Sequence, residues 1–437
     1  MDTLKKIKSK DFTVGIVGLG YVGLPLAYAF SHKNIKTIGF DINSSQTETL
    51  NKKKSYLKHI PDEKIIDMQS KGFEATTNFQ RIQEVDVIVI CVPTPLNRHK
   101  EPDLSAIINT GTTISPFLKK GQLVILESST YPGTTDEKLA ESLEKSNLIK
   151  NKDYYLAYSP EREDPGNKEY STSTIPKIVG ADCPEAKNLV YELYKHIIDD
   201  VILVDSTRTA EAIKLTENIF RSVNIALVNE LKIIFDAMDI DIWEVIEGAS
   251  SKPFGYMPFF PGPGLGGHCI PIDPFYLAYK AKQYGLTSRF IELAGEINTN
   301  MPEIVISKLI KAMNDNLQKS IKGSKILIIG IAYKKNIDDM RESPSLVLIE
   351  SLVSLGASVD FHDEFIPEIP ASREHDSLKG LKSIPLNKKN LNSYDAILIS
   401  TDHSYISYQE IADNSKLIID TRNSMKNIKG KAKIIKA

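Results

Sequence analysis

The sequence lacks most features that would place it outside the ordinary globular enzymes. Its 437 residues include only three cysteines and one tryptophan, and its formal net charge at pH 7 is −2. A sparse, odd set of cysteines does not build a disulfide framework, so we expect reduced thiols and a cytoplasmic protein. A nearly neutral chain has no strong field for nucleic acid or an anionic membrane, so we expect neither as a partner.

Long hydrophobic runs are also missing. The most apolar early stretch, residues 14–30, is interrupted by Gly18, Gly20, Gly23 and Pro25. It cannot form the run of about 20 apolar residues that crosses a bilayer, and we expect no signal peptide before it. Four lysines lie within residues 5–10 without interleaved aromatic residues, which favours a solvated N-terminal arm.

Short apolar segments alternate with helical segments between residues 12 and 204. Their β-branched composition is typical of strands buried on both faces, as in a parallel sheet covered by helices. The alternation predicts a doubly wound α/β domain. The expected strands are 13–17, 36–40, 85–92, 123–126, 155–158, 177–179 and 201–204.

The pattern changes after residue 205. Apolar residues recur at helical spacing over 208–238 and again over 288–317, where Pro302 predicts a kink or break. Strands and a helix then resume, at 325–330, 344–355, 357–362, 394–400 and 416–420. We therefore predict two Rossmann-like doubly wound α/β domains, 1–205 and 319–437. A central helical domain, 206–318, joins them and supplies the interface of a homodimer.

A glycine-rich turn follows the first strand and precedes a helix. Its six residues, from Gly18 to Gly23, read G-x-G-x-x-G, the pattern that binds the pyrophosphate of a dinucleotide. Asp41 ends the next strand, where a carboxylate would bind the ribose hydroxyls and repel a 2′-phosphate. We therefore expect NAD rather than NADP. The expected contacts are Gly18, Gly20, Tyr21, Val22, Gly23, Asp41, Thr94 and Thr130, although either threonine could simply serve a turn or a helix cap.

A loop between the two long helices holds the most informative residues. Four glycines occupy six positions from Gly262 to Gly267, and such a loop can wrap an anion or approach a sugar closely. Cys269 follows it, and Asp273 lies four residues further, near a helix start. This placement makes Cys269 a candidate nucleophile, whereas Cys91 and Cys183 fit buried small hydrophobic positions. The adjacent His268 is expected to point away from it.

Lys214 and Asn218 are four residues apart, so they share one face of the first long helix. A lysine and an amide on one face can stabilise an oxyanion together. Spacing alone also fits an ordinary solvated face.

Taken together, these motifs resemble the nucleotide-sugar 6-dehydrogenases of the UDP-glucose/GDP-mannose dehydrogenase superfamily. The likeness spans nearly the whole chain and includes Ser-Pro-Glu-Arg at 159–162 and the segment 338–344. It implies NAD-dependent oxidation of a UDP-sugar C6 alcohol to a carboxylate in two steps, with Cys269 as the covalent nucleophile and no metal. The products of such enzymes generally feed surface polysaccharides.

The resemblance also implies roles for individual residues. Lys214 and Asn218 would stabilise oxyanions, and Asp273 with Thr130 would position or deprotonate the hydrolytic water. Glu161 would lie near the nicotinamide and the reacting carbon, and Arg341 would reach the cofactor from the C-terminal domain. The implied substrate contacts are Glu161, Arg162, Lys214, Asn218, Phe259, Gly264, Gly266, Gly267, Arg289 and Lys334.

Substrate choice rests on three segments, 159–166, 264–274 and 288–296, which look like the UDP-N-acetylglucosamine branch. UDP-glucose enzymes more often carry serine before the cysteine and lysine before the aspartate, where this chain has His268 and Ile272. The UDP-N-acetylmannosamine branch also has histidine there and is the nearest alternative. Two further alternatives are a β-hydroxyacid dehydrogenase of the 6-phosphogluconate type and a non-catalytic nucleotide-sugar sensor.

Overall fold

The computed structural model describes residues 2–57, 60–97, 100–162, 174–267, 270–372 and 374–437. They form two compact units, Met1–Glu217 with Phe275–Thr287, and Asn218–Pro274 with Ser288–Ala437. His268 and Cys269 lie outside the described residues, as does most of the segment that follows Glu161 and Arg162. The predicted division of the chain at residues 205 and 318 stays a prediction.

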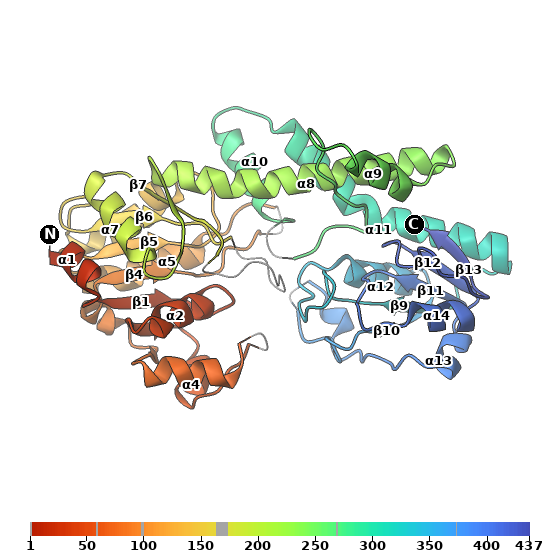
Figure 1. The fold of residues 1–437 in the computed structure, drawn as a ribbon, viewed down its shortest axis with the longest axis horizontal. Helices are drawn as coiled ribbons and strands as arrows, with labels where there is room; N and C mark the ends of the chain where they lie inside the picture. Colours follow the sequence, from red (N-terminus) through yellow and green to blue (C-terminus); the bar gives the residue numbers. More distant parts are fainter. Residues whose placement is uncertain (1, 58–59, 98–99, 163–173, 268–269, 373) are drawn as a thin grey trace. The chain divides into compact units, whose positions relative to one another are not determined.

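The first unit is built on an eight-stranded sheet in the part of the chain that the structure describes (Figure 1). The strand order is β3-β2-β1-β4-β5-β6-β7-β8, and neighbours pair in parallel except β6 with β7. The predicted fold class is confirmed. The strands are β1 (Thr13–Val17), β2 (Lys36–Phe40), β3 (Glu74–Thr76), β4 (Val87–Ile90), β5 (Leu123–Leu126), β6 (Tyr155–Tyr158), β7 (Lys177–Ala181) and β8 (Val201–Val204).

Two expectations about this sheet need correction. The β6–β7 pair is antiparallel, and β8 at the edge is partly exposed rather than buried on both faces. The edge strand β3 was not predicted, because three residues Glu-Ala-Thr form no apolar run. The strand order reverses direction between β1 and β4, and ligands of open α/β sheets bind beyond the strand ends at such a point.

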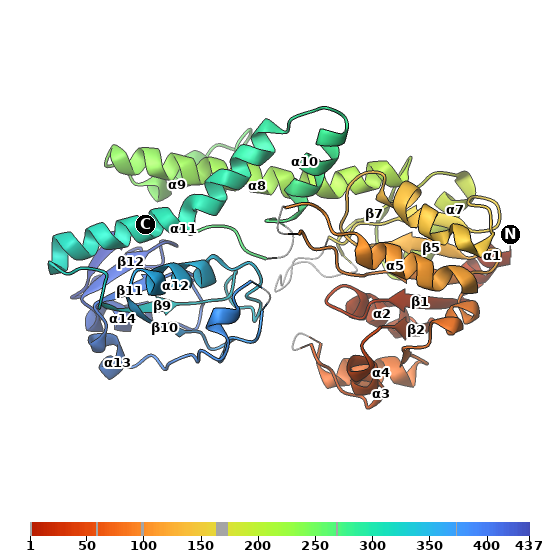
Figure 2. The ribbon, with the colours of Figure 1, turned by 180° about the vertical axis from the view of Figure 1, so that it is seen from behind.

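Helices cover both faces of this sheet. Apolar residues of α1, α2 and α7 share one core cluster with β1, β4 and β5, and Figure 2, seen from behind, shows α5 in front of the strands. The helices are α1 (Asp2–Ser9), α2 (Gly23–His32), α3 (Ser44–Asn51), α4 (Asp62–Ser70), α5 (Ser105–Ile114), α6 (Ala140–Leu143) and α7 (Pro184–Tyr194), with a π-helical turn at Thr134–Leu139.

The expectation of a solvated N-terminal arm is wrong. Residues 2–9 form α1, in which Thr3 and Ile7 are buried. The Lys6 ammonium lies 2.9 Å from the carboxylate of Asp86, and the Thr3 hydroxyl donates to the carbonyl of Gly121. The lysines lie on the outer face of the helix, and its inner face packs on the domain. The lysine content alone therefore did not indicate that the segment is a packed helix.

Long helices follow the first sheet. α8 spans Thr207–Ala237, α9 Ile242–Ser250, α10 Asp273–Gln283 and α11 Arg289–Leu317. Helix α11 continues through Pro302, so the break expected as one possibility there does not occur. No helix of the described residues combines the length and apolarity needed to cross a membrane.

The second unit contains a parallel five-stranded sheet, counted over the described residues, in the order β10-β9-β11-β12-β13. Alternate strand residues face α11 and α12 on one side and α13 and α14 on the other, which gives three layers. The elements are β9 (Lys325–Ile329), α12 (Pro344–Ser354), β10 (Ser358–His362), α13 (Lys388–Ser393), β11 (Ala396–Ile399), α14 (Tyr408–Asn414), β12 (Leu417–Asp420) and β13 (Lys433–Lys436).

Candidate active site

The glycine turn after β1 has three glycines with different surroundings. Gly18 has φ +90°, and a Cβ there would lie 2.6 Å from the carbonyl oxygen of Cys91. A Cβ on Gly23 would lie 1.8 Å from the carbonyl oxygen of Gly18, whereas one on Gly20 would meet no atom within 4 Å. Gly18 and Gly23 are therefore required by packing, and Gly20 leaves open space beside the backbone.

Asp41 lies directly beside this turn. One carboxylate oxygen accepts from the N–H of Leu19 at 2.9 Å, and the other accepts from the N–H of Asn43 at 2.9 Å. Turn, helix N-terminus and carboxylate thus have the arrangement that holds a dinucleotide by its pyrophosphate and ribose. Tyr21, which is 44% exposed, follows Gly20 at the surface.

The two strand-end threonines are buried and tied to neighbouring loops. The Thr94 hydroxyl donates to the carbonyl of Ser129 at 2.8 Å, which joins the ends of β4 and β5. The Thr130 hydroxyl donates to that of Thr134 at 2.5 Å, and Tyr276 donates to the carbonyl of Thr94. Both hydroxyls therefore support the loops at the carboxyl edge of the sheet.

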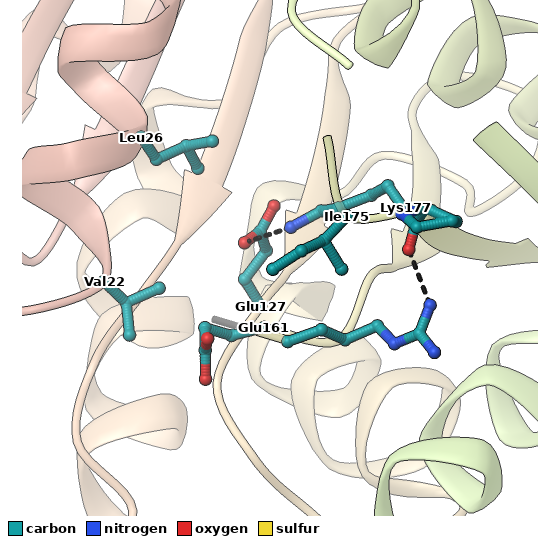
Figure 3. A pocket seen from close by; sticks show the side chains of 8 residues that line it. Val22, Leu26, Glu127, Glu161, Ile175 and Lys177 are labelled. Atoms are coloured by element: carbon teal, nitrogen blue, oxygen red, sulfur yellow. Dashed lines mark hydrogen bonds and ion pairs between the residues drawn. The ribbon is translucent and has the colours of Figure 1, made fainter. Parts of the chain in front are cut away.

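A small pocket lies next to the glycine turn. Glu161 approaches the pocket from the loop after β6, opposite Val22 and Leu26 of the turn and α2 (Figure 3). In its lining the Lys177 ammonium lies 2.9 Å from the carboxylate of Glu127. The full lining is Val22, Leu26, Glu127, Glu161, Arg162, Ile175, Pro176 and Lys177.

Sequence reasoning missed the Glu127–Lys177 pair. Glu127 is 2% exposed and also accepts a hydrogen bond from Tyr194. The available signal was a carboxylate directly after the fully apolar strand β5, and buried carboxylates need a partner.

Lys214 belongs to this side of the site. Its side chain is 5% exposed, and its ammonium donates to the carbonyl of Glu161 at 2.5 Å and lies 3.5 Å from the carboxylate. The alternative of a solvated helix face is therefore wrong for Lys214. Arg162 turns to Glu217, at 2.7 Å, and to the carbonyl of Pro176, at 2.6 Å.

Asn218 and Asp273 form a second pair, within the second unit. The Asn218 amide donates to the Asp273 carboxylate at 2.5 Å, and both side chains are buried. Asp273 is the first residue of α10, as the sequence indicated.

The glycine-rich loop packs on the segment between β9 and α12 of the second unit. A Cβ on Gly266 would lie 2.5 Å from Cβ of Tyr333, and one on Gly267 would lie 3.0 Å from the Tyr333 ring. The N–H of Gly267 donates to the carbonyl of Arg341 at 2.9 Å. Close packing therefore requires these glycines, and the N–H of Gly267 has a protein partner.

The remaining predicted residues are scattered. The Arg341 guanidinium is paired with the Asp339 carboxylate at 2.6 Å, and Lys334 is half-buried in the turn after β9. Phe259 packs edge-on against Phe220, with centroids 5.7 Å apart, and Arg289 is exposed at the start of α11.

The two sheets repeat one local device. Gly18 follows β1 and Gly330 follows β9, and both glycines have a positive φ. Asp363 accepts a hydrogen bond from the N–H of Ile331, as Asp41 does from the N–H of Leu19. Asp363, however, is fully buried and also contacts the ring of His403 at 3.0 Å. In the second turn the carboxylate at this position is therefore buried, whereas Asp41 is partly exposed.

Glu211 is a further buried carboxylate that the sequence did not reveal. It accepts from the N–H groups of Gly133 and Thr135 and from the Thr135 hydroxyl, at 2.7 to 2.9 Å. Burial raises its pKa to about 8, although these hydrogen bonds lower it in part. Burial also raises the pKa of the free thiol Cys91, which suits the unreactive role expected for it.

Metal-binding clusters of three or more His, Cys, Asp or Glu side chains are absent from the described residues.

Comparison with known proteins agrees with these features. The NAD-binding, central and UDP-binding domain profiles of the UDP-glucose/GDP-mannose dehydrogenase family match residues 12–198, 208–300 and 327–427. The chain is 37% identical to UDP-N-acetyl-D-glucosamine 6-dehydrogenase of Pseudomonas aeruginosa, over 90% of this chain and 91% of that one. It is 33% identical to UDP-N-acetyl-D-mannosamine dehydrogenase of Yersinia pestis, over 94% and 98%. A solved UDP-D-ManNAc dehydrogenase of Pyrococcus horikoshii superposes with TM-score 0.86 at 32% identity, covering 97% of this chain and 98% of that one.

Proposed function

The chain belongs to the UDP-glucose/GDP-mannose dehydrogenase family, and on that premise we propose that it oxidises C6 of UDP-N-acetyl-D-glucosamine to the carboxylate. The single observation that carries this choice is the 37% identity to an enzyme named for that substrate. The 33% identity to a UDP-N-acetyl-D-mannosamine dehydrogenase makes that epimer the nearest alternative, and UDP-glucose is the next.

The proposed chemistry uses Cys269 to join two oxidations. NAD, when bound, accepts one hydride in each. The C6 alcohol loses a proton and a hydride to give an aldehyde, and the Cys269 thiolate adds to it. The resulting thiohemiacetal loses a second hydride to become a thioester, and water releases the acid and returns the thiolate. Two NAD are therefore reduced per sugar.

Two pairs of described residues, one in each unit, support this chemistry. Lys214 is a buried cation held at Glu161, where it can stabilise a developing oxyanion. Asn218 orients the carboxylate of Asp273, which is suited to accept a proton from the hydrolytic water. In this proposal, Thr130 and Glu161 would lie near the nicotinamide ring of a bound NAD.

A substrate panel tests the proposal directly. Purified enzyme is given UDP-glucose, UDP-N-acetylglucosamine, UDP-N-acetylgalactosamine and UDP-N-acetylmannosamine, and NADH and acid are quantified. We expect the highest kcat/KM for UDP-N-acetylglucosamine, with two NADH per acid. A higher kcat/KM for another sugar would reassign the substrate. One NADH with a ketone product would indicate a β-hydroxyacid dehydrogenase, and binding without NADH would indicate a sensor.

The nucleophile has its own test. Cys269→Ser should abolish net acid formation, and Cys183→Ser is the matched control that should retain it. Full acid formation by Cys269→Ser would refute the covalent role.

We also propose a homodimer formed through α8. Phe220, Leu227 and Ile234, spaced seven residues apart, are 47%, 49% and 46% exposed, and such an apolar stripe is suited to a helix of a second copy. Arg289 would act across that interface. Light scattering should give twice 48.7 kDa for the wild type and the monomer mass for Leu227→Asp. A monomeric wild type would refute the interface.

A further inference from the structure

Two buried asparagines connect the glycine-rich loop to both long helices of the second unit. The N–H of Gly262 donates to the Asn229 carbonyl oxygen at 3.0 Å. The Asn229 amide donates to the Asn298 oxygen at 2.9 Å, and the Asn298 amide donates to the backbone carbonyl of Ser222 at 3.0 Å. Asn229 is 0% exposed and Asn298 is 3% exposed, so both side chains in this series of hydrogen bonds are buried.

The chain of hydrogen bonds has one consistent direction. Gly262 can only donate through its N–H, so it requires the oxygen of Asn229 and turns that residue's NH2 toward Asn298. The Ser222 carbonyl can only accept, so it requires the NH2 of Asn298. Reversing either amide would place two donors or two acceptors face to face in a buried site, which costs about 1–3 kcal/mol per unsatisfied group.

The loop backbone also contacts α11 directly at this point. A Cβ on Gly264 would lie 3.5 Å from the carbonyl oxygen of Asn298 and 3.6 Å from Cδ of Pro302. Proline has no N–H, so the carbonyl of Asn298, four residues earlier, lacks its usual helical donor. The loop therefore lies on α11 where Pro302 interrupts the hydrogen-bond ladder of the helix.

The second attachment of the loop is on the same face of α8. Asn218, which binds Asp273, and Asn229, which binds Gly262, are 11 residues apart. At 3.6 residues per turn, that spacing gives an angular offset of only about 20° and a rise of about 16 Å. The 11 residues from Gly262 to Asp273 could span about 36 Å when extended, so both ends of the segment are attached well within its reach.

We infer that Asn229 and Asn298 are positioning residues that set where the glycine-rich loop presents Cys269. This inference rests on the nucleophilic role proposed above for that cysteine. Asn218 and Asp273 hold the far end of the loop, and the two buried amides hold its entry. Loss of the entry attachment should misplace the thiol without altering the glycine turn and Asp41 of the NAD site, which belong to the first unit.

Three leucine variants of the full-length enzyme form a graded test. Asn229→Leu removes the acceptor of Gly262, Asn298→Leu leaves that bond but removes its support, and Asn300→Leu changes an exposed asparagine on the same helix. We expect kcat for acid formation to fall at least about tenfold in Asn229→Leu and less in Asn298→Leu, because small misplacements of reacting groups are costly. Asn300→Leu should match the wild type, and KM for NAD should stay within about twofold in all three.

Two readouts separate positioning from a loss of stability. A misplaced thiol lets the aldehyde escape, so NADH per acid should rise above two and a hydrazine trap should collect aldehyde. The rate of Cys269 alkylation by iodoacetamide, resolved by mass spectrometry, should change in the same order. If Asn229→Leu does not fold, Asn298→Leu still decides the question.

Wild-type stoichiometry and alkylation rates in folded Asn229→Leu and Asn298→Leu would overturn the inference, even if both melt at lower temperature. Failure of the proposed function is distinguishable, because it would appear in the wild type itself as no NADH from any UDP-sugar, or as full acid formation by Cys269→Ser. The order of alkylation rates among the variants can be measured in either case.

Discussion

Alanine at two glycines of the same turn should have different consequences for stability, although both should weaken NAD binding. In Gly23→Ala the new Cβ would lie 1.8 Å from the Gly18 carbonyl oxygen, whereas Cβ contacts shorter than 3.0 Å are essentially never seen. Helix α2 must therefore move from β1 by about 1.2 Å. Overpacking of this kind costs about 1–3 kcal/mol, which corresponds to a fall in Tm of roughly 2–12 °C for a domain of this size. The helix N-terminus moves with it, so NAD affinity should fall as well.

Gly20→Ala is the matched control, since its Cβ meets no atom within 4 Å and its φ is not positive. Its Tm should be unchanged or slightly higher, because alanine restricts the unfolded chain by about 0.4–1 kcal/mol. Its NAD affinity should nevertheless drop, because the open space is where the pyrophosphate would approach. Thermal melts and calorimetric NAD titration measure both quantities. A wild-type melt for Gly23→Ala would refute the packing argument, and wild-type NAD affinity for Gly20→Ala would refute the assigned approach.

Three further perturbations address other parts of the site. Asp41→Ala should raise KM for NAD and relax the rejection of NADP, and an unchanged cofactor preference in steady-state kinetics would contradict the ribose role. Lys214→Ala should lower kcat about a hundredfold or more if the ammonium stabilises an oxyanion; a near-normal rate would leave it only a structural role at Glu161. Glu211 has a folded pKa of about 8 against 4.5 when unfolded, so the folded state retains a proton that the unfolded chain releases. The unfolding free energy of the wild type should therefore decline between pH 4.5 and 8 by up to about 1.4 kcal/mol per pH unit relative to Glu211→Gln. Melts of both proteins across that range measure this difference. A difference that does not change with pH would contradict the argument.

The strands were predictable where burial leaves a continuous apolar run. β1, β2 and β5 coincide with the ranges expected from composition, because parallel strands covered on both faces need apolar residues throughout. The antiparallel direction of β7 could not be inferred, since pairing direction depends on how the chain returns to the sheet. Short β3, with one buried residue between two half-buried ones, carried no signal of its own.

The site was predictable as a set of residues but not as a set of contacts. Helical spacing placed Lys214 and Asn218 on one face, yet their partners Glu161 and Asp273 lie 53 and 55 residues away in the sequence. Glu127 and Glu211 were missed for the same reason, because each carboxylate is satisfied by a distant segment. A single sequence shows which groups need partners, and tertiary structure decides which groups provide them.

Helix α8 shows why periodicity identifies a helix without identifying its buried face. In the second unit its apolar residues Phe220, Leu227 and Ile234 are about half exposed. The buried face carries Ala226 and Val228 together with four polar residues, which are Asn218, Ser222, Asn229 and Lys232. A polar face can be buried only when each group finds a partner, and here the partners include Asp273, Gly262 and Asn298. The helix, the glycine-rich loop and α11 are therefore mutually dependent, and a change in any one of them should be felt at the loop that carries Cys269.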